Sequence, residues 1–179
     1  MAGALVWIDL EMTGLDVERH RIVEIASMVT DKDLQIIEEG PDIAISQPKE
    51  VLAAIDSWSA TQHQRSGLLD RVKSSSCDTA GAERITLEFI KRHCAESESP
   101  LCGNSVWQDR RFLARYMPDL EAFLHYRLID VSSVKELAKR WYPGLPRFEK
   151  KETHIALTDI KESIEELKYY REKVFIRNS

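Results

Sequence analysis

Ala-Leu-Val-Trp-Ile-Asp-Leu (residues 4–10) is an apolar stretch near the start of the chain, and Glu11 and a turn at residues 12–15 follow it directly. Its apolar run predicts a buried strand. Asp9 and Glu11 stand two positions apart, so their side chains point to the same face of that strand. Two carboxylates near the end of an apolar strand are costly to bury unless a positive group lies between them. Taken alone, the pair also fits a solvated strand end.

The rest of the chain predicts an α/β fold. Residues 22–31 and 34–45 are expected to form two further strands, joined by a turn at 31–33, so that three antiparallel neighbours open the chain. Helical periodicity dominates from about Glu50 onward. The later elements expected are helices at 57–65, 79–95, 107–117, 131–141 and 154–174, and short strands at 100–103 and 128–129. We therefore expect a mixed β-sheet flanked by helices, in a single domain spanning residues 1–179.

Composition narrows the class of protein. The chain has 179 residues, 43% of them hydrophobic, which suits one globular domain. No apolar run approaches the ~20 residues that span a bilayer, and no signal or transit peptide is visible, so we expect no membrane association and a cytoplasmic or mitochondrial location. Cys77, Cys94 and Cys102 form no Cys-x-x-Cys pair, which fits a reducing compartment. The net charge of −5 argues against a broad basic surface for long nucleic acids.

Two more acidic positions are candidates for a shared site. Asp109 follows the Gly-Asn-Ser loop at 103–105 and falls in the first turn of a predicted helix, where its carboxylate can be aimed at a neighbouring strand end. The alternative for Asp109 is a favourable interaction with the helix dipole. Asp159 lies five residues after His154 and, taken alone, equally fits an exposed helical acid. Carboxylates gathered in one place suit Mg²⁺ or Mn²⁺, because these hard cations prefer oxygen ligands.

The order of these residues resembles the DEDDh exonucleases of the RNase H-like fold, which carry Asp-x-Glu, a central Asp and His-x-x-x-x-Asp. The likeness covers nearly the whole chain and is most specific for the oligoribonuclease family. This resemblance implies a 3′→5′ exoribonuclease that degrades very short RNA, especially dinucleotides, to 5′-mononucleotides. The strings that carry it lie at residues 7–16, 102–105, 108–113, 125–132, 135–141 and 159–163.

The resemblance also implies the chemistry of the site. Asp9, Glu11, Asp109 and Asp159 would hold two divalent cations, Mg²⁺ or Mn²⁺, in a two-metal-ion phosphodiester hydrolysis. His154 would take the proton from the attacking water, a role that suits its near-neutral reference pKa.

Substrate-binding positions follow from the same resemblance. Leu15 and Trp58 would pack against the two terminal bases, although Trp58 without the resemblance is better explained as a half-buried core aromatic. His63 would reach a phosphate. In the family the cap tyrosine comes from the partner subunit, which implies a homodimer acting on short single-stranded RNA. The residues that resemble a cap over the terminal 5′-phosphate are Ser105, Tyr126, Arg127 and Ser132.

One departure from the family pattern stands at Thr158, where an aspartate usually precedes the ligand. The spacing of five from His154 selects Asp159 as the ligand, so the site is expected to survive. One alternative is a catalytically inactive RNA-binding protein, and the substitution at Thr158 is the only feature that favours it. The other is a DEDDh exonuclease that acts on longer DNA or RNA. The string Tyr-Arg-Leu-Ile-Asp-Val-Ser (126–132) and the lack of a broad basic surface argue against the latter.

Overall fold

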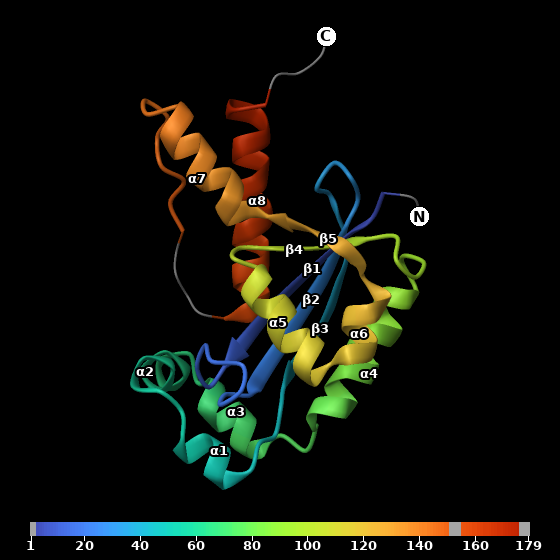
Figure 1. Cartoon of the computed structure of the whole chain (residues 1–179), viewed down its shortest axis with the longest axis vertical. Coiled ribbons are helices and arrows are strands. Elements are labelled where there is room, and N and C mark those ends of the chain that lie inside the picture. The colour runs from blue at the N-terminus through green and yellow to red at the C-terminus, as the bar shows by residue number, and fades with distance from the viewer. Residues whose placement is uncertain (1–2, 151–154, 176–179) are drawn as a thin grey trace.

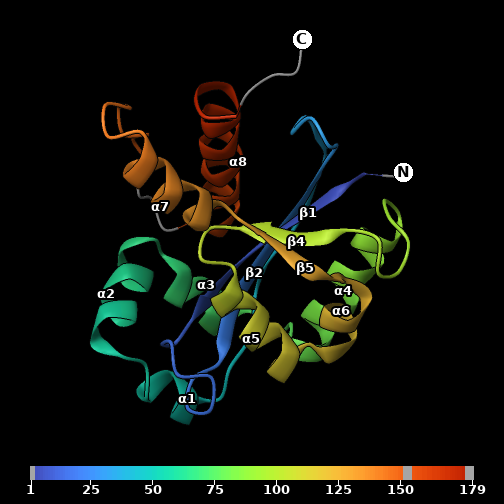
Figure 2. The same cartoon turned by 45° about the horizontal axis from the view of Figure 1, so that its top comes forward.

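The computed structural model describes residues 3–150 and 155–175, and its helices cover both faces of one sheet (Figures 1 and 2). The strands are β1 Leu5–Met12, β2 Ile22–Thr30, β3 Ile36–Ala44, β4 Pro100–Gly103 and β5 His125–Asp130. The helices are α1 Lys49–Ala53, α2 Ser57–Arg65, α3 Leu68–Ser74, α4 Thr79–Lys91, α5 Trp107–Tyr116, α6 Pro118–Phe123, α7 Val131–Trp141 and α8 Ala156–Lys173. The predicted α/β class with a mixed sheet is confirmed.

The sheet has the strand order β3-β2-β1-β4-β5. β1 is antiparallel to β2 and parallel to β4, and β4 is parallel to β5. The carboxyl ends of β1, β4 and β5 therefore lie at one edge of the sheet. The chain extends the sheet to one side of β1 with β2 and β3, and to the other with β4 and β5. Crevices at such a reversal of strand order, outside the carboxyl ends, are where open α/β sheets bind ligands.

Alternate side chains of β1 enter two separate hydrophobic clusters. Val6, Ile8 and Leu10 pack with residues of α4, α5 and α6 on one face, whereas Trp7 packs with residues of α7 and α8 on the other. Burying each large apolar side chain stabilises the fold by about 1.5–3 kcal/mol, so both helix layers are held firmly to β1. Asp9 shares its face with Trp7 and so points toward α8.

Three short helices, α1, α3 and α6, were not predicted. They have five, seven and six residues, too few for a helical period to show in the sequence. Pro118, expected only to end the preceding helix, also opens α6, because the first turn of a helix needs no N–H from that residue. The helix predicted for 79–95 ends at Lys91. Beyond it, the N–H groups of Arg92 and His93 donate hydrogen bonds to the carbonyls of Phe89 and Ile90, three residues back, in place of the four-residue spacing of an α-helix.

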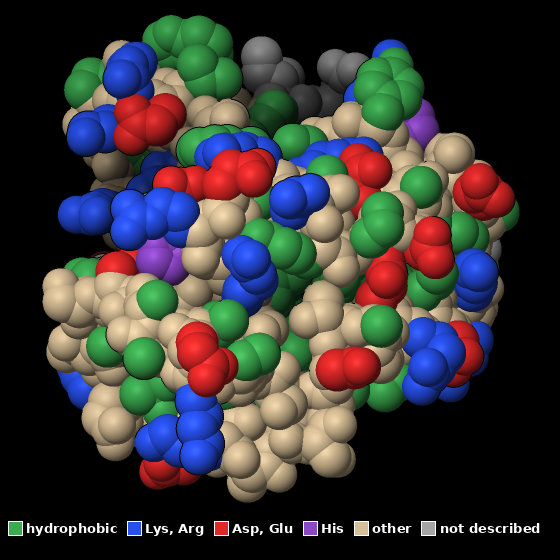
Figure 3. All heavy atoms as spheres, turned by 60° about the horizontal axis from the view of Figure 1, so that its bottom comes forward, with side chains coloured by type: hydrophobic (Ala, Val, Ile, Leu, Met, Phe, Trp, Pro, Cys, Tyr) green, Lys and Arg blue, Asp and Glu red, His purple; other side chains and the backbone are tan. Residues whose placement is uncertain are grey.

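The surface carries charges of both signs. Figure 3 shows acidic and basic side chains interspersed with hydrophobic and uncharged areas on one face of the molecule. This distribution agrees with the net charge of −5. Among the described residues, no helix has both the length and the apolar character needed to cross a bilayer.

Candidate active site

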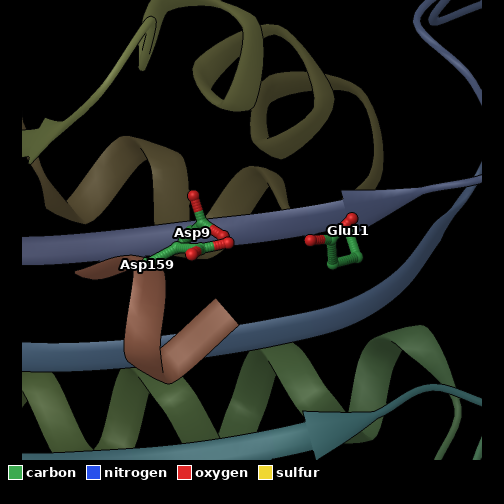
Figure 4. Close-up of side chains that lie close together, drawn as sticks. All are labelled: Asp9, Glu11 and Asp159. Carbon is green, nitrogen blue, oxygen red and sulfur yellow. The ribbon is translucent and has the colours of Figure 1, made fainter. Parts of the chain in front are cut away.

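Three carboxylates from opposite ends of the chain meet on the central strand β1, toward its carboxyl end. Asp9 and Glu11 project from β1, and Asp159 projects from the first turn of α8 (Figure 4). Each offers a ligand oxygen, and these oxygens lie within 4.8 Å of one another. The strand period places Asp9 and Glu11 on one face, and the packing of α8 on that face brings Asp159 to them. A hard divalent cation fits such a set of oxygen ligands.

Asp109 joins the same region through β1 itself. The backbone N–H of Leu10 donates a 3.0 Å hydrogen bond to Oδ1 of Asp109. This N–H is available because β4 pairs with β1 only at Val6 and Trp7, so that α5 takes the place of a neighbouring strand. The carboxylate of Asp109 is buried, with 7% of the residue exposed, and it lies in the first turn of its helix as predicted.

The carboxylates raise one another's pKa. Burial raises the pKa of Asp9 well above its usual range, and the charges of Asp109, Glu11 and Asp159 add to the rise. Burial raises the pKa of Glu11 to about 8, with further contributions from Glu24, Asp159 and Asp109. Burial likewise raises the pKa of Asp109 to about 7, although the N–H of Leu10 counteracts the rise. Negative charge gathered without a cation is unfavourable here, and a divalent ion would relieve it.

Glu24 is a fifth acid of this region, and it was not among the residues predicted from the sequence. It lies directly opposite Glu11 in the antiparallel pairing of β1 with β2, and only 1% of it is exposed. Arg71 of α3 forms an ion pair with Glu24 and a 2.9 Å hydrogen bond to Asp42. Burial and Asp42 raise the pKa of Glu24 to about 7, while Arg71 opposes the rise. A single acid inside the apolar run 22–26 was the signal for it in the sequence.

His63 lies beneath the site and not at its surface. Only 1% of it is exposed, and its Nε2–H donates a 2.8 Å hydrogen bond to the carbonyl of Met12. Its Nδ1 lies 3.6 Å from Oε2 of Glu11. The structure thus places His63 against the end of β1 and against one carboxylate of the cluster. Its predicted contact with a phosphate stays a prediction.

Leu15 and Trp58 are large apolar side chains that the fold leaves exposed, by 65% and 61% respectively. The turn that carries Leu15 is anchored to the start of α2, because the N–H of Asp56 donates a 2.9 Å hydrogen bond to the carbonyl of Thr13. Gly14 permits this approach, since a Cβ atom there would lie only 2.6 Å from Oδ2 of Asp56. The core position considered for Trp58 does not agree with its exposure.

Ser105 and Ser132, predicted as parts of a phosphate cap, are in contact. The N–H of Ser105 donates 3.0 Å hydrogen bonds to Oγ of Ser132 and to Oδ1 of Asp130, and the two hydroxyls lie 3.1 Å apart. Asp130 also caps α7 by accepting a hydrogen bond from the N–H of Ser132. The loop after β4 therefore contacts the end of β5 and the first turn of α7, at the same edge of the sheet that carries the carboxylates.

Tyr126 and Arg127 lie on β5, the edge strand next to β4. Tyr126 is 71% exposed and stacks on His125 with ring centroids 4.5 Å apart. The guanidinium of Arg127 lies 5.1 Å from the centre of the Tyr126 ring. Both side chains are thus displayed outward, and a phosphate-binding role for them stays a prediction.

His154, the expected base, lies outside the described residues. Thr158 is partly buried in the first turn of α8, next to Asp159. Of this neighbouring pair, Asp159 is the one whose side chain joins Asp9 and Glu11.

Comparisons with known proteins agree with this arrangement. The RNase T exonuclease family model matches residues 6–167. An oligoribonuclease of Thiobacillus denitrificans is 56% identical over 174 residues, covering 97% of this chain and 95% of the relative. One from Shewanella loihica is 58% identical over 172 residues, covering 96% and 95% respectively.

Solved structures extend the comparison to the fold. The zinc-bound complex of E. coli exonuclease I with single-stranded DNA is 12% identical, with a TM-score of 0.75 over 97% of this chain. Exonuclease I of Methylocaldum szegediense is 16% identical, with a TM-score of 0.66 over 96% of this chain. This chain spans 41% of the length of each of these two proteins, so they share its fold over that portion. The RNase H-like exonuclease fold that was expected is confirmed. By its sequence and its fold, the chain belongs to the oligoribonuclease family of exonucleases.

Proposed function

We propose that this chain is a 3′→5′ exoribonuclease that hydrolyses very short RNA, especially dinucleotides, to 5′-mononucleotides, and that residues 1–179 act as a single exonuclease domain. The observation that carries the proposal is the convergence of Asp9, Glu11 and Asp159 within 4.8 Å, at the carboxyl end of β1. Relatives named oligoribonucleases, 54–58% identical over nearly the full chain, support the same activity.

Asp9, Glu11, Asp109 and Asp159 would hold two divalent cations, Mg²⁺ or Mn²⁺. Such a pair supplies an activated water and stabilises the leaving 3′-oxygen. The raised pKa values of Asp9, Glu11 and Asp109 support this assignment, because each carboxylate needs a cation to ionise fully at neutral pH. The protein's part is to hold these oxygens in place. His154 would accept the proton of the attacking water.

Leu15 and Trp58 would hold the two terminal bases of the substrate. Both side chains are exposed. The turn that follows β1 carries Leu15, and α2, which carries Trp58, lies near the carboxyl end of the same strand (Figure 1). Base stacking on an aromatic face contributes about 1–3 kcal/mol per base without sequence preference, which suits an enzyme that degrades any short RNA. His63, whose Nδ1 lies 3.6 Å from Oε2 of Glu11, would reach a phosphate of the substrate.

Ser105, Arg127 and Ser132 would bind the terminal 5′-phosphate. Hydroxyls and a guanidinium are suited to a phosphate monoester, since both donate hydrogen bonds to its oxygens. The contact between the two serines supports this role. A phosphate held there closes the site to longer RNA, and local positive charge then replaces the broad basic surface that a long substrate would need.

We also propose that the chain is a homodimer in which Tyr126 enters the partner's site. Large apolar side chains are exposed along β5 and α7, where Tyr126, Leu137 and Trp141 are 71%, 44% and 67% exposed. Exposed aromatic and aliphatic side chains next to an edge strand favour association with another chain.

A reducing compartment, the cytoplasm or the mitochondrion, suits the free cysteines Cys77, Cys94 and Cys102.

The test is incubation of the protein with a 5′-labelled diribonucleotide and Mg²⁺. We expect complete conversion to mononucleotides, and none with chelator or with Asp9→Asn, which keeps the shape of the side chain. Intact dinucleotide after long incubation at high enzyme concentration would overturn the proposal. A twenty-nucleotide RNA is the comparison substrate, because a phosphate cap should keep it out of the site. Equal turnover of the dinucleotide and the long RNA would exclude the phosphate cap.

A further inference from the structure

Three side chains of α5 form hydrogen bonds with the backbone of the segment from Leu10 to Val17. Asp109 accepts a hydrogen bond from the N–H of Leu10 at 3.0 Å. Gln108 donates a hydrogen bond from Nε2 to the carbonyl of Leu15 at 2.6 Å. Tyr116, at the far end of the helix, donates from its hydroxyl to the carbonyl of Val17 at 2.5 Å. One helix therefore contacts a carboxylate-bearing strand and the exposed turn beyond it.

The amide of Gln108 is held in one orientation. Nη1 of Arg111 donates a 3.1 Å hydrogen bond to Oε1 of Gln108, and this guanidinium lies 5.8 Å from the centre of the Trp107 ring. Oε1 can only accept and Nε2 can only donate, so this orientation alone satisfies both Arg111 and the Leu15 carbonyl. The exposed Leu15 side chain thus stands on a backbone fixed from both sides, by Gln108 and by the Thr13–Asp56 contact.

We infer that Gln108 is a positioning residue that fixes Leu15 relative to the metal-binding carboxylates, and so sets how the terminal base of the substrate is held. This inference rests on the proposed function, in which Leu15 packs against that base. Gln108 adjoins Asp109, so the same turn of α5 holds a metal ligand and the base-contacting turn at a constant separation. Tyr116 supports the far end of that turn, and Arg21 in turn donates a 2.6 Å hydrogen bond to its hydroxyl.

The decisive experiment is a double-mutant cycle with Gln108→Met and Leu15→Ala, using the diribonucleotide and Mg²⁺. Gln108→Met keeps the side-chain length and removes the donor. Loss of one hydrogen bond of ordinary strength predicts about a fivefold rise in KM, with kcat changed less than about twofold. In the Leu15→Ala background the same substitution should change kcat/KM by less than about twofold, because the group it positions is gone. Gln64→Met, at an exposed position of α2, is the matched control and should leave KM unchanged.

Two further measurements separate Gln108's effect on Leu15 from an effect on Asp109. Calorimetric titration with Mn²⁺ should give the same affinity for Gln108→Met as for the unmodified chain. Amide hydrogen exchange of residues 13–18 should accelerate in Gln108→Met and, to a smaller extent, in Arg111→Met. Equal losses of kcat/KM in both backgrounds of the cycle, or weakened Mn²⁺ binding, would overturn the inference.

Failure of the proposed function gives a different result. In that case the unmodified chain leaves the dinucleotide intact, while exchange at residues 13–18 still reports whether Gln108 holds the turn. Unchanged exchange in Gln108→Met would overturn the positioning role on its own.

Discussion

The N–H of Leu10 and the carboxylate of Asp109 form a 3.0 Å hydrogen bond at the point of β1 that lies between Asp9 and Glu11. The bond occupies an edge of β1 that β4 leaves unpaired after Trp7. It fixes the start of α5 to the strand that carries the other two acids. The site is therefore built on the sheet itself, and the fold holds its carboxylates close to one another. Their mutual repulsion leads to the first prediction.

Metal-free protein should lose stability as the pH rises from about 6 to 8. Glu11 and Asp109 have folded pKa values of about 8 and 7, above their unfolded values, and the pKa of Asp9 is raised as well. An acid with a raised folded pKa stabilises the fold while it is protonated and loses that contribution as the pH passes through the folded pKa. We expect Tm in chelator to fall by more than ~4 °C over this range, measured by differential scanning calorimetry.

Mg²⁺ should restore most of that loss at pH 8, because ionised carboxylates bind the ion and the unfolded chain does not gather them. The control is the double variant Asp9→Asn, Glu11→Gln, whose Tm should depend less on pH and respond less to Mg²⁺. A wild-type Tm that rises between pH 6 and 8 in chelator, relative to this variant, would contradict the electrostatic account.

Asp159→Asn should lower kcat for the dinucleotide by more than ~100-fold, since it removes the charge of a proposed metal ligand while keeping the shape of the side chain. Thr158→Ala, one position away on α8, should stay within ~3-fold of the unmodified chain, because Thr158 is not in the carboxylate cluster. Steady-state kinetics with Mg²⁺ measures both. The opposite ranking would mean that the ligand has been assigned to the wrong residue.

Arg71→Met should lower the free energy of unfolding by about 1–3 kcal/mol at pH 8, because it leaves the buried Glu24 without its counter-ion. This loss is smaller than the roughly 3–5 kcal/mol typical of breaking a fully buried ion pair, because the Arg71 side chain is itself 42% exposed and solvent weakens its attraction to Glu24. The loss should be smaller at pH 6, where Glu24, with a pKa of about 7, is mostly protonated. Urea unfolding of metal-free protein at both pH values measures it.

Arg65→Met, at an exposed position of α2, is the control for Arg71 and should change stability by less than ~0.5 kcal/mol. Equal destabilisation by Arg71→Met at pH 6 and pH 8 would show that packing, and not charge, links Arg71 to Glu24.

Mixing two inactive variants tests whether Tyr126 acts across a dimer. Tyr126→Ala retains the carboxylates, and Asp159→Asn retains Tyr126, so a mixed dimer has one complete site if the tyrosine comes from the partner. We expect each variant alone to be impaired and their mixture to regain dinucleotide cleavage as the subunits exchange. Light scattering after size exclusion checks the dimer, and a mixture no more active than the sum of its parts would exclude this arrangement.

The placement of Asp9 and Glu11 on one face could be predicted from the sequence, because the two-residue period of a strand depends only on local backbone geometry. The sequence also predicted the main strands and helices and, through the order of acidic residues, the family. The short helices α1, α3 and α6 could not be predicted from the sequence, because one or two helical turns contain too few residues to reveal a helical period.

The groups that surround this pair of acids are known only from the three-dimensional structure. Glu24 faces Glu11 because of the register of β1 with β2, and His63 is buried behind the end of β1. Gln108 of α5 donates a hydrogen bond to the carbonyl of Leu15 in the turn after β1. Each contact joins segments far apart in the chain, so it depends on strand order and helix packing and leaves no local pattern to detect. The Asp9–Glu11 pair gains its partners Asp159 and Asp109 for the same reason: α8 packs on its face of β1, and α5 occupies the edge that β4 leaves open.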